Sequence, residues 1–215
     1  LTRMLRLVTP MSCLISSAHN TNEEGRGRML AYRLTDWLTE MSSNVSCEAV
    51  AAFERKGAIR PGRMITVHNG IDTEKFAFDP TARARVRAEL GLDQDTILLL
   101  SVGRLAVQKD YPNLLRAFSY LQDEGYPLHL GIVGDGPLRA ELESMVSALA
   151  MRDRVHFFGV RHDVPALMCA SDIFVLSSAW EGFGLVVAEA MACERPVVAT
   201  DSGGVREVVG EAGSL

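Results

Sequence analysis

Three short segments of the chain combine glycine with charged side chains that could bind a phosphorylated ligand. The first reads Gly103-Arg104-Leu105 and is followed by Lys109, and the second reads Glu181-Gly182-Phe183-Gly184. The third reads Asp201-Ser202-Gly203-Gly204. Glycine lets the backbone approach a ligand closely, and Arg and Lys can donate charged hydrogen bonds to phosphate oxygens. These residue types therefore indicate an anionic ligand that carries phosphate.

A carboxylate in the following helix suggests that this ligand also carries a ribose. We expect a helix to begin at Gly184, and Glu189 then lies about one and a half turns into it. The free N–H groups and positive dipole end of such a helix suit phosphate. The neighbours of Glu189 are apolar, so its carboxylate needs a partner, and two ribose hydroxyls would provide one. Glu181 precedes the helix and is expected to face a sugar.

Alternating apolar and amphipathic stretches predict the elements that position these residues. Short β-branched runs separated by helical patterns are typical of βαβ units with a parallel sheet. The charged segments follow three predicted strands, and ligands of open parallel sheets lie beyond the carboxyl ends of the strands. We predict strands at residues 13–16, 64–67, 96–102, 128–133, 155–158, 173–176 and 196–200. We predict helices at residues 27–41, 81–90, 113–121, 137–150, 164–169 and 184–193, with a further helix starting at Gly204.

Apolar side chains indicate which faces of two predicted helices are buried. Leu30, Leu34 and Leu38 lie on one side of the helix at 27–41. In the helix at 113–121 the corresponding face carries Leu114, Leu115, Phe118 and Leu121.

Six motifs, in order and with their spacing, resemble those of one enzyme family. EGFGLVVAE at residues 181–189 has the pattern E-x7-E. The others are VHNGID (67–72), GRLAVQKD (103–110), VGDGPLRAEL (133–142), VHFFG (155–159) and DSGGVREVV (201–209). Together they resemble the retaining glycosyltransferases of family 4, also called glycosyltransferase group 1, which have the GT-B fold. The resemblance runs from Val67 to the end of the chain and extends more loosely over residues 12–46.

The resemblance implies a role for each matching residue. Arg104 and Lys109 would bind the donor diphosphate and stabilise it as a leaving group, Glu189 would bind the ribose, and Glu181 and His19 would lie at the donor sugar. The remaining implied donor-binding residues are Gly103, then Gly159 and Val160 near the base, and finally Gly182, Phe183, Gly184 and Leu185 around the phosphate or sugar. Without the motifs, Arg104 and Lys109 would be interpreted as surface charges. His19 and Glu181 would be interpreted as ordinary hydrogen-bonding residues.

The resemblance also implies a fold and a domain division. The expected class is α/β of the GT-B type, with a doubly wound, Rossmann-like C-terminal domain and the remnant of an N-terminal Rossmann-like domain. Residues 1–72 would form the C-terminal part of the N-terminal, acceptor-side domain. Residues 73–215 would form the donor-binding domain, truncated at its C-terminus. The chain starts with Leu and lacks recognisable matches to the first strand and the last helix of the family, so we expect it to be incomplete.

The implied activity is transfer of a hexosyl group from a UDP- or GDP-sugar to a saccharide or lipid-linked acceptor with retention of configuration, in polysaccharide, glycolipid or lipopolysaccharide synthesis. No cofactor or metal is expected, because paired cations can neutralise the departing phosphate. Asp93-Gln94-Asp95 formally matches a metal-binding DxD motif, but it precedes a strand, and we interpret it as a solvated turn. We expect a cytoplasmic protein, with peripheral association with the inner membrane face as a further option.

Alternatives to this activity remain open. A truncated chain could bind a nucleotide-sugar without turnover, and a GT-B epimerase or a phosphorylase is a less favoured reading. The net charge of −5 argues against a nucleic-acid partner. Gly134-Asp135-Gly136 lacks the third glycine of a dinucleotide fingerprint, since Arg139 takes its place, and is interpreted as a tight turn. The four cysteines and the histidines show no zinc-like spacing, and we expect reduced, mostly buried thiols.

Overall fold

A computed structural model describes residues 2–20, 26–122 and 125–215. The chain divides into two compact units. Unit 1 comprises residues 1–70 together with the segments 180–184 and 202–208, and unit 2 comprises residues 71–179, 185–201 and 209–215. The division is therefore not one cut in the sequence, because two segments that follow strands of unit 2 group with unit 1.

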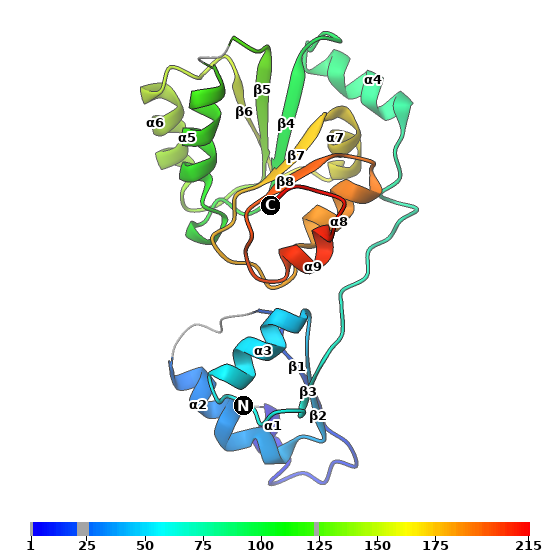
Figure 1. Ribbon diagram of the computed structural model, residues 1–215, viewed down its shortest axis with the longest axis vertical. Helices are drawn as coiled ribbons and strands as arrows, with labels where there is room; N and C mark the ends of the chain where they lie inside the picture. The colour runs from blue at the N-terminus through cyan, green and yellow to red at the C-terminus, as the bar shows by residue number, and fades with distance from the viewer. Residues whose placement is uncertain (1, 21–25, 123–124) are drawn as a thin grey trace. The chain divides into compact units, whose positions relative to one another are not determined.

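Unit 1 contains a three-stranded parallel sheet in the order β1-β2-β3 (Figure 1). In register, Ile15 pairs with Met41, and Ser42 pairs with Met64. The strands are β1 (Ile15–Ser17), β2 (Met41–Asn44) and β3 (Met64–Thr66). The helices are α1 (Thr2–Leu5), α2 (Arg26–Thr35), the 3-10 helix η1 (Asp36–Leu38) and α3 (Cys47–Arg55).

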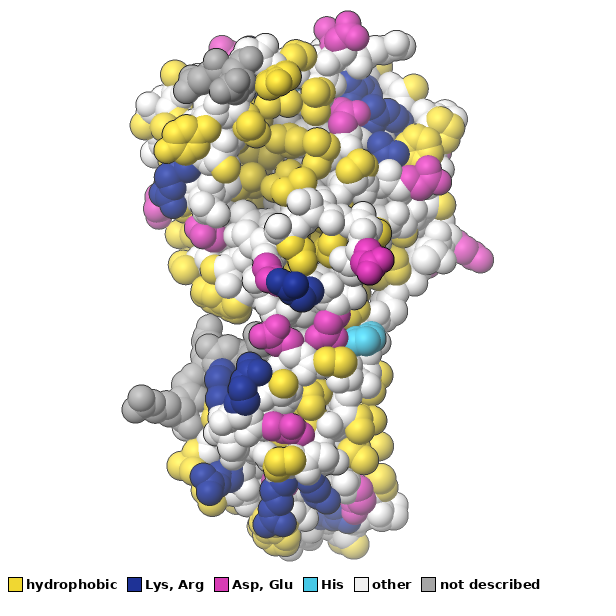
Figure 2. All heavy atoms as spheres, in the orientation of Figure 1, with side chains coloured by type: hydrophobic (Ala, Val, Ile, Leu, Met, Phe, Trp, Pro, Cys, Tyr) yellow, Lys and Arg dark blue, Asp and Glu magenta, His cyan; other side chains and the backbone are white. Residues whose placement is uncertain are grey.

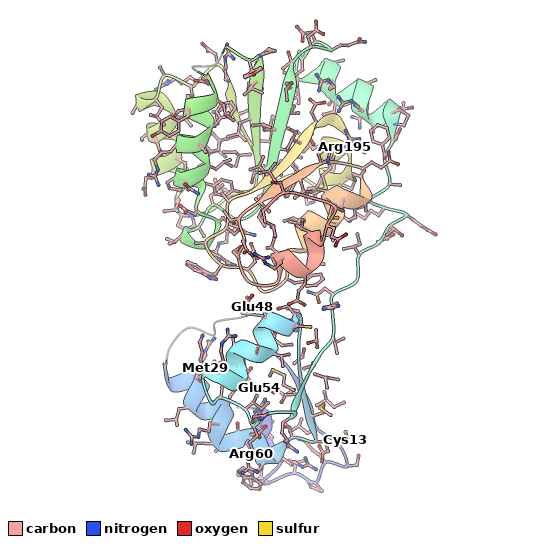
Figure 3. The ribbon with its side chains drawn as sticks, in the orientation of Figure 1. Cys13, Met29, Glu48, Glu54, Arg60 and Arg195 are labelled. Atoms are coloured by element: carbon pink, nitrogen blue, oxygen red, sulfur yellow. The ribbon has the colours of Figure 1, made fainter. Side chains whose placement is uncertain are left out.

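The core of unit 1 lies between α2, α3 and the sheet. Phe53 is fully buried, and the ring of Tyr32 contacts it edge-on at a centroid distance of 5.2 Å. Met29, labelled on α2 in Figure 3, packs against the same core. Ser46 caps α3, since its hydroxyl accepts a hydrogen bond from Ala49 N at 3.1 Å. Such a cap satisfies an N–H group that the helix leaves unpaired.

The predicted helix at 27–41 was wrong in its end and in its buried face. It stops at Thr35, and its last predicted residue, Met41, begins β2. Leu30 and Leu34 are 54% and 63% exposed, and only Leu38 of the predicted face is buried. Met29 and Tyr32 pack against the core instead, so the buried face of the helix was predicted on the wrong side.

Unit 2 contains a five-stranded parallel sheet in the order β6-β5-β4-β7-β8. The helices α5 and α6 lie on one face of this sheet, and α4, α7 and α8 lie on the other (Figure 1). The strands are β4 (Ile97–Val102), β5 (Leu128–Val133), β6 (Val155–Gly159), β7 (Ile173–Leu176) and β8 (Val197–Ala199). The helices are α4 (Pro80–Glu89), η2 (Val107–Lys109), α5 (Tyr111–Gln122), α6 (Arg139–Ala148), α7 (Val164–Ala170) and α8 (Leu185–Ala192). A last helix, α9 (Val205–Val209), begins in the segment 202–208 of unit 1.

Apolar runs account for the core of unit 2. Leu98, Leu100 and Leu130 are fully buried, as expected for strands covered on both faces. The buried face of α5 carries Leu114, Leu115 and Phe118 as predicted, but Leu121 is 43% exposed.

A partly buried ion-pair cluster fixes α4 to the sheet. Asp172 accepts hydrogen bonds from Leu98 N at 2.8 Å, from Arg87 Nη1 at 3.0 Å and from Arg83 Nη2 at 2.5 Å. Burial alone would raise the pKa of Asp172, but these hydrogen bonds and the charges of the two arginines outweigh it, and the pKa is lowered. The carboxylate thus ties α4 to the start of β7 and to β4.

Two features concern the chain as a whole. Cys169 and Cys193 are buried, but Cys13 and Cys47 are exposed, so the prediction of mostly buried thiols was wrong for half of them. In the described residues, we find no helix that combines the length and apolar character needed to cross a membrane.

Candidate functional site

The strand order of unit 2 places a ligand site at the carboxyl ends of β4 and β7. The chain runs from β4 to β5 and β6 on one side of the sheet, and then crosses back to β7 on the other side of β4. The direction of winding therefore changes between β4 and β7, and open parallel sheets bind ligands in the crevice outside such a switch point. The loop that begins with Gly103 follows β4, and the loop that leads to α8 follows β7.

The two predicted phosphate-binding cations both follow β4. Arg104 is exposed, and Lys109 ends the short helix η2. The side chain of Lys109 crosses Gly103 so closely that an added Cβ there would lie 3.0 Å from Lys109 Cε. Tyr111 Oη donates to the Gly103 carbonyl at 3.3 Å, and Ser177 Oγ donates to the Lys109 carbonyl at 2.7 Å. Ser177, the residue after β7, thus fixes the backbone of Lys109 at the carboxyl edge of the sheet.

Backbone hydrogen bonds join the loops after β4, β5 and β6. Gly103 N donates to the Val133 carbonyl at 2.9 Å, and Gly134 N donates to the Gly159 carbonyl at 2.8 Å. Val160, the next residue after Gly159, is 69% exposed. The residues predicted to lie near the base are therefore at the same sheet edge as Gly103.

Gly134 occupies a position where no side chain fits. Its φ is 129°, and an added Cβ would lie 2.0 Å from the carbonyl oxygen of Gly103. This contact brings the backbone of the Gly134-Asp135-Gly136 segment against the backbone that carries Arg104. Residues 134–136 themselves have irregular structure, and the turn follows at residues 137–138, before α6 begins at Arg139.

Glu189 lies on α8, half-buried, with a raised pKa. Burial is the main cause of the higher pKa, and the positive charge of Lys75 offsets part of it. Gly184, with φ of 88°, immediately precedes Leu185 at the start of this helix. A carboxyl group whose charge is disfavoured by burial, on the helix that follows β7, is a candidate functional residue.

The other predicted residues belong to unit 1. Glu181 is 7% exposed, and His19 is an exposed residue just after β1. An added Cβ at Gly182 would lie 2.3 Å from the His19 carbonyl oxygen, so the two backbones are in direct contact. The ring of Phe183 stacks on His68 at a centroid distance of 5.6 Å.

Sequence reasoning missed three supporting residues. The positive charge of Lys75 lowers the pKa of Glu189. Ser177 donates a hydrogen bond to the Lys109 carbonyl, and Tyr111 donates one to the Gly103 carbonyl. Ser177 could have been found, since it directly follows a predicted strand. Lys75 and Tyr111 carried no such signal.

The formal DxD segment serves the fold. Asp93 Oδ1 accepts from Thr96 N at 2.8 Å and from Thr96 Oγ1 at 2.6 Å, and these hydrogen bonds lower the pKa of Asp93. The segment precedes β4 and so lies at the amino end of that strand, away from the carboxyl edge. The interpretation as a turn agrees with this geometry.

Within unit 2, Gly103, Arg104, Lys109, Gly159 and Val160 lie at the ends of β4 and β6 or in the loops after them, while Leu185 begins α8 and Glu189 lies further along that helix. Within unit 1 the structure groups His19 with residues 181–184. Their individual roles in donor binding stay predictions.

Comparison with known proteins gives a consistent set of matches. A family model described as "Glycosyl transferases group 1" matches residues 82–214. Alpha-maltose-1-phosphate synthase of Mycolicibacterium smegmatis is 32% identical over 195 residues, which cover 84% of this chain and 50% of that protein. A GDP-mannose-dependent alpha-(1-6)-phosphatidylinositol monomannoside mannosyltransferase of the same organism is 39% identical over 150 residues, 65% of this chain and 39% of that protein.

A solved structure extends the similarity to the fold. Alr3699/HepE of Anabaena in complex with UDP superposes with a TM-score of 0.84 and 26% identity, covering 96% of this chain and 58% of that one. The present chain spans about half the length, or less, of the curated relatives named above.

Proposed function

Because the chain belongs to the group 1 glycosyl transferases and has their α/β, GT-B type of fold, we propose that it carries the donor-binding part of a retaining hexosyltransferase. The whole protein would move a hexosyl group from a nucleotide-diphosphate sugar to a saccharide or lipid-linked acceptor. The observation that carries this proposal is the position of Arg104 and Lys109 in the segment that follows β4, at the switch point of the sheet.

The diphosphate is the part of the donor that this site suits best. A UDP complex is known for one relative, and another is named as GDP-mannose-dependent, so the diphosphate is common to both. When the bond between the anomeric carbon and the phosphate oxygen breaks, negative charge develops on the diphosphate. A guanidinium and an ammonium group held in place beforehand stabilise that charge.

Carboxylates would position the remainder of the donor. Glu189 would accept hydrogen bonds from ribose hydroxyls, which replace the solvent that burial removes. Glu181 and His19 would contact the sugar, and the backbone of residues 182–185 would lie along the phosphate or sugar. Gly159 and Val160 would contact the base.

The proposal requires no metal for transfer, because the cations of the chain would neutralise the leaving group. It also places the reaction in polysaccharide, glycolipid or lipopolysaccharide synthesis in the cytoplasm, with the inner face of the membrane as an alternative location. A lipid-linked acceptor would favour that second location.

Calorimetric titration with UDP and GDP tests the diphosphate assignment. Arg104→Ala and Lys109→Ala should each weaken binding by about 1.5–3 kcal/mol, on the order of tenfold or more, since each removes a charged hydrogen-bond donor. Arg116→Ala is the matched control, because Arg116 is an exposed arginine on α5. Equal affinities in all four proteins would refute the assignment.

A second candidate function is nucleotide-sugar binding without turnover. It is favoured by the partial coverage of the relatives, because this chain spans 50% and 39% of the length of the two named above. Donor hydrolysis or transfer by residues 1–215 alone would exclude it. Turnover seen only in a longer protein that contains this sequence would assign catalysis to the combined parts.

A further inference from the structure

Three potential metal ligands from distant parts of the sequence meet in unit 1, and we propose that they bind a zinc-class divalent ion. The ligand atoms of Cys47, His68 and Glu207 all lie within 4.8 Å of one another. Cys47 is the first residue of α3, His68 follows β3, and Glu207 lies on α9. All three belong to unit 1.

Neighbouring groups hold each of the three side chains. Glu207 Oε2 accepts from Cys47 N, and Glu207 Oε1 accepts from Glu48 N, both at 2.8 Å. Thr66 Oγ1 donates to Cys47 Sγ at 3.5 Å. Metal sites depend on such outer hydrogen bonds to orient their ligands.

The histidine is oriented in the same way. His68 Nε2 lies 3.2 Å from Glu207 Oε2, and its ring stacks on Phe183 with an interplanar angle of 27°. The nitrogen therefore faces the carboxylate, and the stacking limits rotation of the ring. A metal ion would bind between this nitrogen and the carboxylate and replace their direct contact.

The donor set determines the class of ion. One sulfur, one imidazole nitrogen and one carboxylate oxygen are the ligand types of Zn²⁺, which takes four ligands in a tetrahedron. Water would fill the fourth position. Mg²⁺ and Ca²⁺ prefer oxygen ligands alone, so they should compete poorly. Because all three ligands are exposed, an ion could enter and leave without unfolding the unit.

Co²⁺ titration of the chelator-treated protein tests the site directly, in a reductant that does not bind metal. We expect one Co²⁺ per chain, a thiolate-to-cobalt charge-transfer absorption, and displacement by Zn²⁺ but not by Mg²⁺. Cys47→Ser should abolish the charge-transfer absorption, and it keeps the backbone N–H that donates to Glu207. His68→Gln should weaken binding by about tenfold or more.

Two controls match these variants. Cys13→Ser removes the other exposed cysteine, which Figure 3 shows far from Glu48 at the start of α3. His162→Gln removes an exposed histidine of unit 2. Both should bind like the unchanged protein. Absence of the charge-transfer absorption, or equal affinity in Cys47→Ser and Cys13→Ser, would overturn the proposal. Thermal unfolding with chelator present verifies that each variant is folded before it is titrated.

Discussion

Replacing Gly134 by alanine changes the loop that carries Arg104 without removing any charged group. The added Cβ would lie 2.0 Å from the Gly103 carbonyl oxygen and 2.9 Å from its carbonyl carbon. Both atoms are backbone, so no side chain can rotate away to make room. The loops after β4 and β5 must separate, and the direct hydrogen bond from Gly103 N to the Val133 carbonyl must lengthen.

The cost of this substitution has two parts. A φ of 129° is a conformation that side-chain-bearing residues rarely adopt, and imposing it costs about 1–3 kcal/mol. Forcing extra volume into a close contact costs a further 1–3 kcal/mol or so. We therefore expect Gly134→Ala to lower the free energy of unfolding by about 2–6 kcal/mol. Gly91→Ala is the matched control, because Gly91 has φ of 65° and open space around its Cβ position. It should cost only about 1–2 kcal/mol.

Urea unfolding followed by circular dichroism measures the two free energies, and calorimetric titration with UDP measures the effect on binding. Gly134→Ala should weaken UDP binding by about tenfold or more, equivalent to 1.4 kcal/mol, because Arg104 moves with the loop. Gly91→Ala should leave the affinity unchanged. If Gly134→Ala is no less stable than Gly91→Ala and binds UDP normally, the loops do not depend on this contact and the reasoning fails.

Two further predictions concern pH. His129 Nδ1 and His156 Nε2 lie 2.8 Å apart. Burial lowers the pKa of both histidines from 6.5, and the charges of His156 and Arg154 lower that of His129 further. As the pH falls, these histidines take up protons in the unfolded chain at a higher pH than in the folded chain. Their contribution to the free energy of unfolding should therefore be fully present above about pH 6.5 and be lost as the pH drops through the lower pKa values of the folded state. His129→Asn should flatten this fall in urea unfolding measured over about pH 5–8, and an unchanged slope would contradict the assignment. Because burial raises the pKa of Glu189 above 4.5, UDP affinity should decrease as acid protonates the carboxylate. Glu189→Gln should make this decrease smaller and leave only the part caused by protonation of the diphosphate; calorimetric titration across the same pH range checks it.

The fold of unit 2 could be predicted from the sequence because its strands are mostly apolar, and the residues of β4 and β5 are mostly buried. The predicted strands at 128–133 and 173–176 coincide with β5 and β7. The strand β2 of unit 1 could not be found in this way, because its buried residues are polar. Ser42 is fully buried and accepts a hydrogen bond from Arg3 Nη2 at 3.1 Å, so partners elsewhere in the chain, and not apolar character, make this strand.

The candidate site was predictable only where a local motif marks it. Arg104 and Lys109 stand in a motif that directly follows a recognisable strand, and the structure places both at the expected edge of the sheet. The cluster of Cys47, His68 and Glu207 had no such signal, because its members are up to 160 residues apart. Zinc-binding spacings in a sequence reveal ligands that share one turn or hairpin, and this cluster is formed by tertiary structure alone.

The motif glycines have a structural role that the sequence motifs did not predict. The glycines of the segment 181–184 were predicted to let the backbone approach a ligand, yet Gly182 is filled on its Cβ side by the His19 carbonyl oxygen. Gly134 is likewise required by the neighbouring loop. At these two positions the close approach is between two parts of the protein, and it holds the loops in place. We therefore expect ligand recognition to depend mainly on side chains near those loops, foremost Arg104 and Lys109, and on Glu189 of α8.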